Sequence, residues 1–186
     1  MENEMGSVTG FQPGEECRLC EGKCCKSKGC SLSPEDMLSE MRLCAYQGNS
    51  ASEIEAFLKD ENGLYAIDYF TDAQGKCFFL RMKHKCFTFI GVDAYGECIM
   101  LSKEGCKMPF ERRPRGGRLL QSSPDYNCRQ QYTGEMMRRD WNPYQEVLSR
   151  IYAKYDQQFE SDGTYDRCEE AAMERMRRER PKTQEV

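Results

Sequence analysis

Four cysteines fall within nine residues near the start of the chain, in the segment Cys17-Arg-Leu-Cys20-Glu-Gly-Lys-Cys24-Cys25, which we name the first cysteine block. A gap of two residues lets a turn bring two thiolates to one metal ion, and Gly22 lets the backbone fold back toward it. Neighbouring side chains tend to diverge, so we expect Cys24 and Cys25 to differ in role, one of them facing a second site or bridging two irons. The block therefore predicts a cysteine knuckle that is organised by its ligands.

Apolar residues are scarce for a chain of this size. Hydrophobic residues make up 39% of the 186 residues, whereas roughly 45–50% is usual for a globular chain. A closed thiolate site contributes directly to the free energy of folding, so a structural metal could replace the missing core. His84 is the only histidine, which excludes a three-histidine zinc site and a Cys2His2 finger.

The N-terminus and the cysteines together indicate the compartment. Residues 1–10 are acidic and polar, without the basic and apolar regions of a signal peptide, and we expect a flexible tail in a cytoplasmic protein. Thiols stay reduced there, so clustered cysteines are more typical of metal ligands than of disulfides. The even number of twelve cysteines also suits a secreted disulfide framework, which is the alternative interpretation.

Charge and hydropathy limit the partners. The formal net charge is -4 and the isoelectric point is about 5.3, which gives no overall attraction to nucleic acid or to anionic membranes. No apolar run approaches the roughly 18 residues that a membrane span needs. We therefore expect a metal ion or cluster as the ligand, no nucleic-acid or membrane partner, and leave a protein partner open.

Local patterns predict a small single α+β domain. Ser33 can cap a helix with Pro34 at its first position and Asp36 three residues after the cap. A second short helix begins after Ser50 or Ser52. Four runs rich in aromatic and branched residues predict a small antiparallel sheet, with turns such as 72–75 between them. These runs are Leu64–Thr71, Lys76–Met82, Phe87–Val92 and Glu97–Leu101.

The last third of the chain carries two helical patterns, over Glu135–Asp156 and Tyr165–Arg180, which we expect to pack over the sheet as a pair. Pro143 kinks the first helix or marks its true start. The strongly charged end is a solvated tail or a helix that binds a partner. We therefore divide the chain into a flexible tail at 1–10, a cysteine-cluster metal-binding domain at 11–160, and a charged C-terminal helix or tail at 161–186.

A metal bound by the first cysteine block needs further ligands from distant cysteines. The candidates in this sequence are Cys30, Cys77, Cys86, Cys98, Cys106 and Cys128, whereas Cys44 and Cys168 lie on helical stretches and are expected to be ordinary thiols. Sites made only of thiolates suit zinc or an iron–sulfur cluster rather than magnesium, calcium or manganese. A mixed ligand set like that of Rieske centres would need a second nitrogen donor beside His84, so we expect a solvated turn histidine outside the site.

The first cysteine block and the following Leu32-Ser33-Pro34-Glu35-Asp36 are similar to the YkgJ-type cysteine-cluster family, described as a zinc- or iron-chelating domain. A second cysteine block, Cys98-Ile-Met-Leu-Ser-Lys-Glu-Gly-Cys106 followed by Arg113-Pro114, resembles that family's second motif. The family has Cys-Arg soon after Arg-Pro, but this chain has Gly117-Arg118, and its next Cys-Arg is Cys128-Arg129. The resemblance spans Cys17–Cys128 and makes Cys128 the displaced ligand. The flagellin lysine N-methylases look like more distant relatives.

The motifs and the resemblance together predict a metal-binding protein that chelates zinc or an iron–sulfur cluster through thiolates. The candidate ligands are Cys17, Cys20, Cys24, Cys25, Cys86, Cys98, Cys106 and Cys128. The alternative function is an iron–sulfur enzyme of protein modification or electron transfer, similar to the lysine N-methylases.

The basic loop 103–118 is a candidate anion site. Its residues Arg113, Arg115 and Arg118 could hold phosphate or a substrate carboxylate, and Gly116-Gly117 allows close approach of the backbone. The other interpretation is a charged, exposed loop. Catalytic residues cannot be named, because the chain has no Gly-x-Ser-x-Gly elbow and no phosphate-binding glycine loop.

Overall fold

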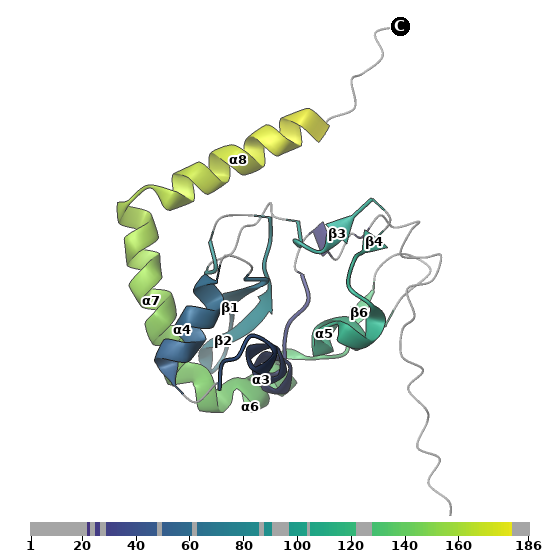
Figure 1. Ribbon diagram of the computed structural model, residues 1–186, viewed down its shortest axis with the longest axis vertical. Coiled ribbons are helices and arrows are strands. Elements are labelled where there is room, and N and C mark those ends of the chain that lie inside the picture. Colours follow the sequence, from purple (N-terminus) through teal and green to yellow (C-terminus); the bar gives the residue numbers. More distant parts are fainter. Residues whose placement is uncertain are drawn as a thin grey trace, which may run out of the picture.

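The computed structural model of the chain describes residues 22, 25–26, 29–47, 50–60, 63–85, 88–90, 97–103, 105–121 and 128–179. Within these ranges the fold is the predicted mixture of α and β, with three two-stranded antiparallel sheets and a helical C-terminal third (Figure 1). None of the helices in this part of the chain has the length and apolarity to cross a membrane. The predicted tail at 1–10 lies outside the described residues.

The centre of the fold is a hairpin of strands β1 (Tyr65–Asp72) and β2 (Gly75–Met82). The strands pair antiparallel along their full length, from Tyr65 opposite Met82 to Asp72 opposite Gly75. The turn falls at 72–75 as predicted, and Gly75 has a φ of 98°, a conformation that glycine adopts without strain. Both strands therefore match their predicted ranges to within one residue.

The two faces of this hairpin have different coverings, because successive side chains of a strand point to opposite sides. The core face packs against helices α4 (Ala51–Lys59) and α7 (Gln145–Ser161): the ring of Tyr69 lies 5.5 Å from that of Tyr152, and Phe57 stacks on Tyr65 at 5.4 Å. The cavity face is the opposite one. It carries Ala66, Asp68, Phe70, Cys77, Phe79 and Arg81.

Helix α3 (Pro34–Leu43) begins where the sequence predicts, at a capping box. The hydroxyl of Ser33 accepts from the N–H of Asp36 at 3.2 Å, and the Asp36 carboxylate accepts from the N–H of Ser33 at 2.9 Å. Its apolar side buries Met37 and Met41 completely. Helix α4 has Ser50 as its N-cap, one of the two predicted starts.

The segment that leads into α3 runs beside β2 as a short additional strand-like stretch. The N–H of Leu32 donates to the carbonyl of Leu80, and the N–H of Met82 donates to the carbonyl of Cys30, both at 2.8 Å. The indole N–H of Trp141 donates to the carbonyl of Leu32 at 3.0 Å. Cys30 is thereby fixed at the edge of the hairpin by main-chain hydrogen bonds.

The prediction of a continuous strand over Glu97–Leu101 is wrong. The chain makes a single bridge at Cys98 and then turns, because the N–H of Leu101 donates back to the carbonyl of Cys98 at 2.9 Å. A short strand β3 (Leu101–Ser102) follows and pairs with β4 (Gly105–Cys106). Of the run Phe87–Val92, the structure describes 88–90, which contributes one parallel bridge between Ile90 and Ile67.

The segment after β4 is more ordered than the loop that the sequence predicts. It forms a 3-10 turn (Phe110–Arg112) and a one-turn helix α5 (Arg115–Arg118). Strand β5 (Leu120–Gln121) then pairs with β6 (Arg129–Gln130). Figure 1 shows α7 on one side of the hairpin and α5 with β6 on the other.

Pro143 breaks the predicted C-terminal helix as expected. Helix α6 (Gly134–Trp141) gives way to a 3-10 turn (Asn142–Tyr144) that contains this proline, and α7 begins at Gln145. The amide of Gln145 accepts from the N–H of Phe78 at 2.8 Å and donates to the carbonyl of Phe78 at 2.7 Å. This side chain ties the first turn of α7 to β2.

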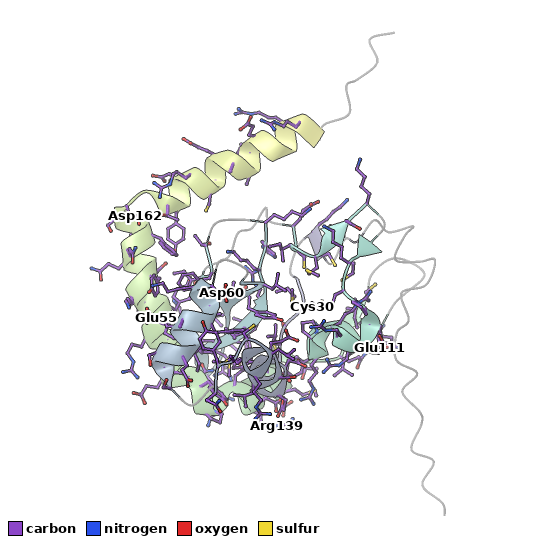
Figure 2. All side chains as sticks on the ribbon, viewed as in Figure 1. Cys30, Glu55, Asp60, Glu111, Arg139 and Asp162 are labelled. Atoms are coloured by element: carbon purple, nitrogen blue, oxygen red, sulfur yellow. The ribbon has the colours of Figure 1, made fainter. Side chains whose placement is uncertain are left out.

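The last helix, α8 (Thr164–Glu179), leaves α7 at a corner formed by Asp162 and Gly163 and projects from the body of the protein (Figures 1 and 2). The hydroxyl of Tyr165 donates to the carboxylate of Asp156 at 2.6 Å across this corner. We predicted that both C-terminal helices pack over the sheet. Helix α7 does so, whereas α8 packs against the end of α7.

A small polar cluster joins α4 to α7 and leads to a prediction on pH. The carboxylate of Glu55 accepts from the ammonium of Lys154 at 2.8 Å and from the hydroxyl of Tyr155 (Figure 2). The hydrogen bond from Lys154, followed by that from Tyr155, lowers the pKa of Glu55. At pH 7 we expect Glu55→Gln to lower the free energy of unfolding by about 1 kcal/mol or less, because the pair is partly solvated.

The pH dependence follows from the direction of this shift. A carboxyl whose pKa is lower in the folded state stabilises the protein above its unfolded value of about 4.3, and the contribution disappears as the pH falls through the folded pKa. The difference between wild type and Glu55→Gln in urea unfolding should therefore vanish in acid. Glu146→Gln, in an exposed pair with Arg150, is the control and should have no effect at either pH. A difference that persists in acid would contradict the assignment.

Candidate metal centre and the adjoining cavity

The described parts of the two cysteine blocks lie against each other. The N–H of Cys98 donates to the carbonyl of Cys25 at 2.7 Å. Gly22 is buried, has a φ of 71°, and packs so closely that a Cβ there would lie 2.7 Å from Cδ1 of Leu101. Leu101 in turn pairs with Cys106 across β3 and β4. A side chain at position 22 would therefore require Leu101 to shift and would hold the backbone in a conformation that favours glycine.

A cavity of about 800 Å³ lies between the cavity face of the hairpin and the segments that carry the cysteines. Cys25, Cys30 and Cys128 line it, together with His84. The opposite walls come from the cavity face, from α5 and from the beginning of α6; they include Asp68, Phe70, Phe79, Arg81, Gly116, Thr133, Gly134 and Met137. A volume of this size is in the range of small-molecule sites, which run from about 300 to 1,000 Å³.

Cys30, labelled in Figure 2, is partly buried where α5 packs against its segment. The N–H of Gly116 donates to the carbonyl of Ser31 at 2.9 Å, and a Cβ on Gly117 would lie 2.9 Å from the sulfur of Cys30. The close backbone approach predicted for Gly116-Gly117 is thus present, but its partner is the chain's own segment 30–31.

The three arginines of the candidate anion site are engaged within the fold. Arg113 is buried, and its carbonyl accepts from the guanidinium of Arg118. Arg118 also pairs with Asp36 of α3 at 2.9 Å, and Arg115 pairs with Asp140 of α6 at 3.1 Å. These contacts join α5 to α3 and α6, so the guanidinium groups do not surround one open space. Anion binding by Arg113, Arg115 and Arg118 stays a prediction.

The expectation that His84 is a solvated turn residue is wrong. Its side chain is 2% exposed, and its Nε2 atom is buried. Its backbone pairs with that of Cys98, and Gly29 lies beside the ring, where a Cβ would be 3.6 Å from Nε2. The flanking Lys83 and Lys85 make the local pattern polar, so the sequence around His84 could not reveal its burial.

A buried ion pair on the cavity wall was missed by the sequence analysis. The guanidinium Nε of Arg81 donates to the carboxylate of Asp68 at 2.6 Å, and the side chains are 3% and 13% exposed. Arg81 also donates to the carbonyl of Met82 at 3.0 Å, and the N–H of Tyr69 donates to Asp68 at 2.7 Å. Opposite charges at diagonal positions of an otherwise apolar hairpin are the pattern that could have identified it.

Cys77, a candidate distal ligand, lies on the cavity face but is fully buried and does not line the cavity. Burial raises the pKa of its thiol. A fully buried thiol outside the cavity suits a packing role, as for a small apolar side chain.

Cys17, Cys20, Cys24 and Cys86, four of the eight candidate ligands, lie outside the described residues. Among the residues that the structure describes, no three His, Cys, Asp or Glu side chains come together as a metal site. The described candidates are nonetheless neighbours. The main chains of Cys25 and Cys98 are hydrogen-bonded, and Cys128 lines the same cavity as Cys25. Cys106 pairs with Leu101, which packs on Gly22 of the first block. Their donor chemistry fits zinc or an iron–sulfur cluster.

No protein-family model, curated protein or solved structure matches the chain. Its class follows from the fold and the candidate site alone: a small α+β protein in which the described parts of two cysteine blocks lie against each other beside a cavity. The similarity to the cysteine-cluster family stays a prediction from the motifs.

Proposed function

We propose that the chain is a metal-binding protein that chelates zinc or an iron–sulfur cluster through the thiolates of its two cysteine blocks. The observation that carries the proposal is the contact between the blocks, in which the N–H of Cys98 donates to the carbonyl of Cys25 at 2.7 Å. The ligands are drawn from Cys17, Cys20, Cys24, Cys25, Cys86, Cys98, Cys106 and Cys128.

A structural contribution from the metal would act on the cysteine-bearing side of the hairpin. The aromatic contacts of Tyr69 and Tyr65 lie on the core face, toward α7 and α4. The opposite side has a charged pair, Asp68 and Arg81, in the wall of its cavity. A thiolate-bound metal would add folding free energy on this side.

The test is the metal content of protein purified without oxygen, compared between Cys20→Ser and Cys44→Ser. We expect stoichiometric metal in the wild type and in Cys44→Ser, because Cys44 is exposed at the C-cap of α3 and lies outside both blocks. Cys20→Ser should lose the metal, since a serine hydroxyl is a poor substitute for a thiolate ligand. Full metal content and an unchanged fold in Cys20→Ser would contradict the proposal.

The cavity favours a second candidate function, an iron–sulfur enzyme of protein modification or electron transfer. Cys25, one of the proposed ligands, lines a space large enough for a small substrate, and the Asp68–Arg81 pair could orient its polar groups. The visible spectrum of the same preparation tests this second function. A colourless protein with zinc alone contradicts the enzyme, whereas a brown protein with iron and sulfide, bleached on reduction, is required by the enzyme and agrees with both functions.

A further inference from the structure

His84 is buried where the cysteine-bearing segments meet. It lines the cavity with Cys25, Cys30 and Cys128, and its Nε2 atom is shielded from solvent beside Gly29. The only histidine of the sequence thus lies beside Cys25 and Cys128, two of the proposed metal ligands, and an imidazole is itself a common metal ligand.

The backbone places His84 directly opposite Cys98. On one side of their bridge the N–H of Lys85 donates to the carbonyl of Glu97 at 2.7 Å, and on the other the N–H of Ile99 donates to the carbonyl of Lys83 at 2.9 Å. This pattern makes His84 and Cys98 a non-hydrogen-bonded antiparallel pair, the kind in which facing side chains are closest. Their Cβ atoms are then about 4.5–5.5 Å apart on one face.

The same hydrogen-bond pattern explains why the segment that contains Cys25 lies on the other side of Cys98. In a non-hydrogen-bonded pair the N–H of Cys98 points away from His84, and here it donates to the carbonyl of Cys25 at 2.7 Å. The segments of His84, Cys98 and Cys25 thus lie side by side, with Cys98 in the middle. Two of these three residues are among the ligands of the proposed metal centre.

We infer that His84 is a ligand of that centre and shares a metal ion with Cys98, so that the donor set combines thiolates with one imidazole. The inference rests on the proposed function. Zinc–sulfur and zinc–nitrogen bonds are about 2.3 Å and 2.0–2.1 Å long, so a facing Cys and His at this separation can reach one ion. A single nitrogen donor suffices for a Cys3His zinc site.

The test uses His84→Cys and His84→Gln in full-length protein, with Lys85→Gln as a control from the same segment. If the purified protein contains zinc, it is replaced by Co²⁺ and the visible absorption is recorded. A thiolate gives a weaker ligand field than imidazole, so His84→Cys should move the cobalt bands to longer wavelength. His84→Gln should weaken Co²⁺ binding by at least the roughly 10–100-fold that loss of an outer-shell partner costs. Lys85→Gln should leave both properties unchanged.

If the purified protein contains an iron–sulfur cluster, the measurement is its reduction potential. Histidine ligation raises the potential relative to cysteine, so His84→Cys should lower it while keeping the cluster. A metal-loaded His84→Cys protein with the spectrum or potential of the wild type would overturn the inference and leave the proposed function standing. Absence of metal from the wild type, with no uptake of Co²⁺, would overturn both.

Discussion

Arg81→Met should lower the free energy of unfolding by about 3–5 kcal/mol, the usual cost of leaving one partner of a buried ion pair without the other. The carboxylate of Asp68 would lose the guanidinium that now lies 2.6 Å away, and its side chain is only 13% exposed. Methionine has a similar volume to the arginine stem, so the effect comes from the unpaired charge rather than from a void. Urea unfolding followed by circular dichroism measures it.

Two further variants separate this effect from a general loss of packing. Asp68→Leu combined with Arg81→Met removes both charges and should recover most of the lost stability. Arg150→Met breaks a fully exposed pair with Glu146 and should cost less than about 1 kcal/mol. A cost for Arg81→Met as small as that for Arg150→Met would show that the pair contributes nothing to the fold.

Trp141→Ala is expected to cost about 3–5 kcal/mol, as for large aromatic residues elsewhere. Trp141 is fully buried, and its indole N–H donates to the carbonyl of Leu32 at 3.0 Å, which ties α6 to the segment that carries Cys30. Trp141→Phe keeps most of the ring contacts and should lose mainly the hydrogen bond, a net of about 0.5–1.5 kcal/mol. Thermal unfolding by circular dichroism is the measurement, since the variants lack the only tryptophan.

Leu43→Ala provides the surface reference for this series. Leu43 is 69% exposed at the end of α3, and its truncation should change the stability by no more than about 0.5 kcal/mol. If Trp141→Phe proved as costly as Trp141→Ala, the hydrogen bond to Leu32 rather than the buried ring would dominate at this position.

The parts of the fold that could be predicted depend on neighbours in sequence. The capping box at Ser33 and Asp36 uses two residues three positions apart, and the break at Pro143 follows from the missing N–H of a single residue. The hairpin required only two runs of strand residues joined by a turn ending in Gly75. In each case the conformation that the local sequence favours is the one found in the fold, and tertiary contacts do not change it.

The features that could not be predicted depend on partners far along the chain. Arg118 pairs with Asp36, which lies 82 positions earlier in the chain, and the sequence of the basic loop does not indicate this contact. His84 is buried, and its bridge partner Cys98 lies 14 positions further along the chain. The spacing of the cysteines and the family resemblance predicted two cysteine blocks, and the structure brings Cys25 and Cys98 of these blocks together. The cavity beside them could not be predicted, because it arises from the packing of the hairpin, α5 and α6.

The amide of Gln145 has a consequence for association with other molecules. A strand at the margin of a sheet offers unpaired N–H and C=O groups that can recruit a strand from another protein and start aggregation. In β2 these outward groups are occupied at Leu80 and Met82 by the segment 30–32, and at Phe78 by both ends of the Gln145 amide. A single side chain at the start of a helix thus imitates one residue of a neighbouring strand and closes this margin against cross-chain β-pairing.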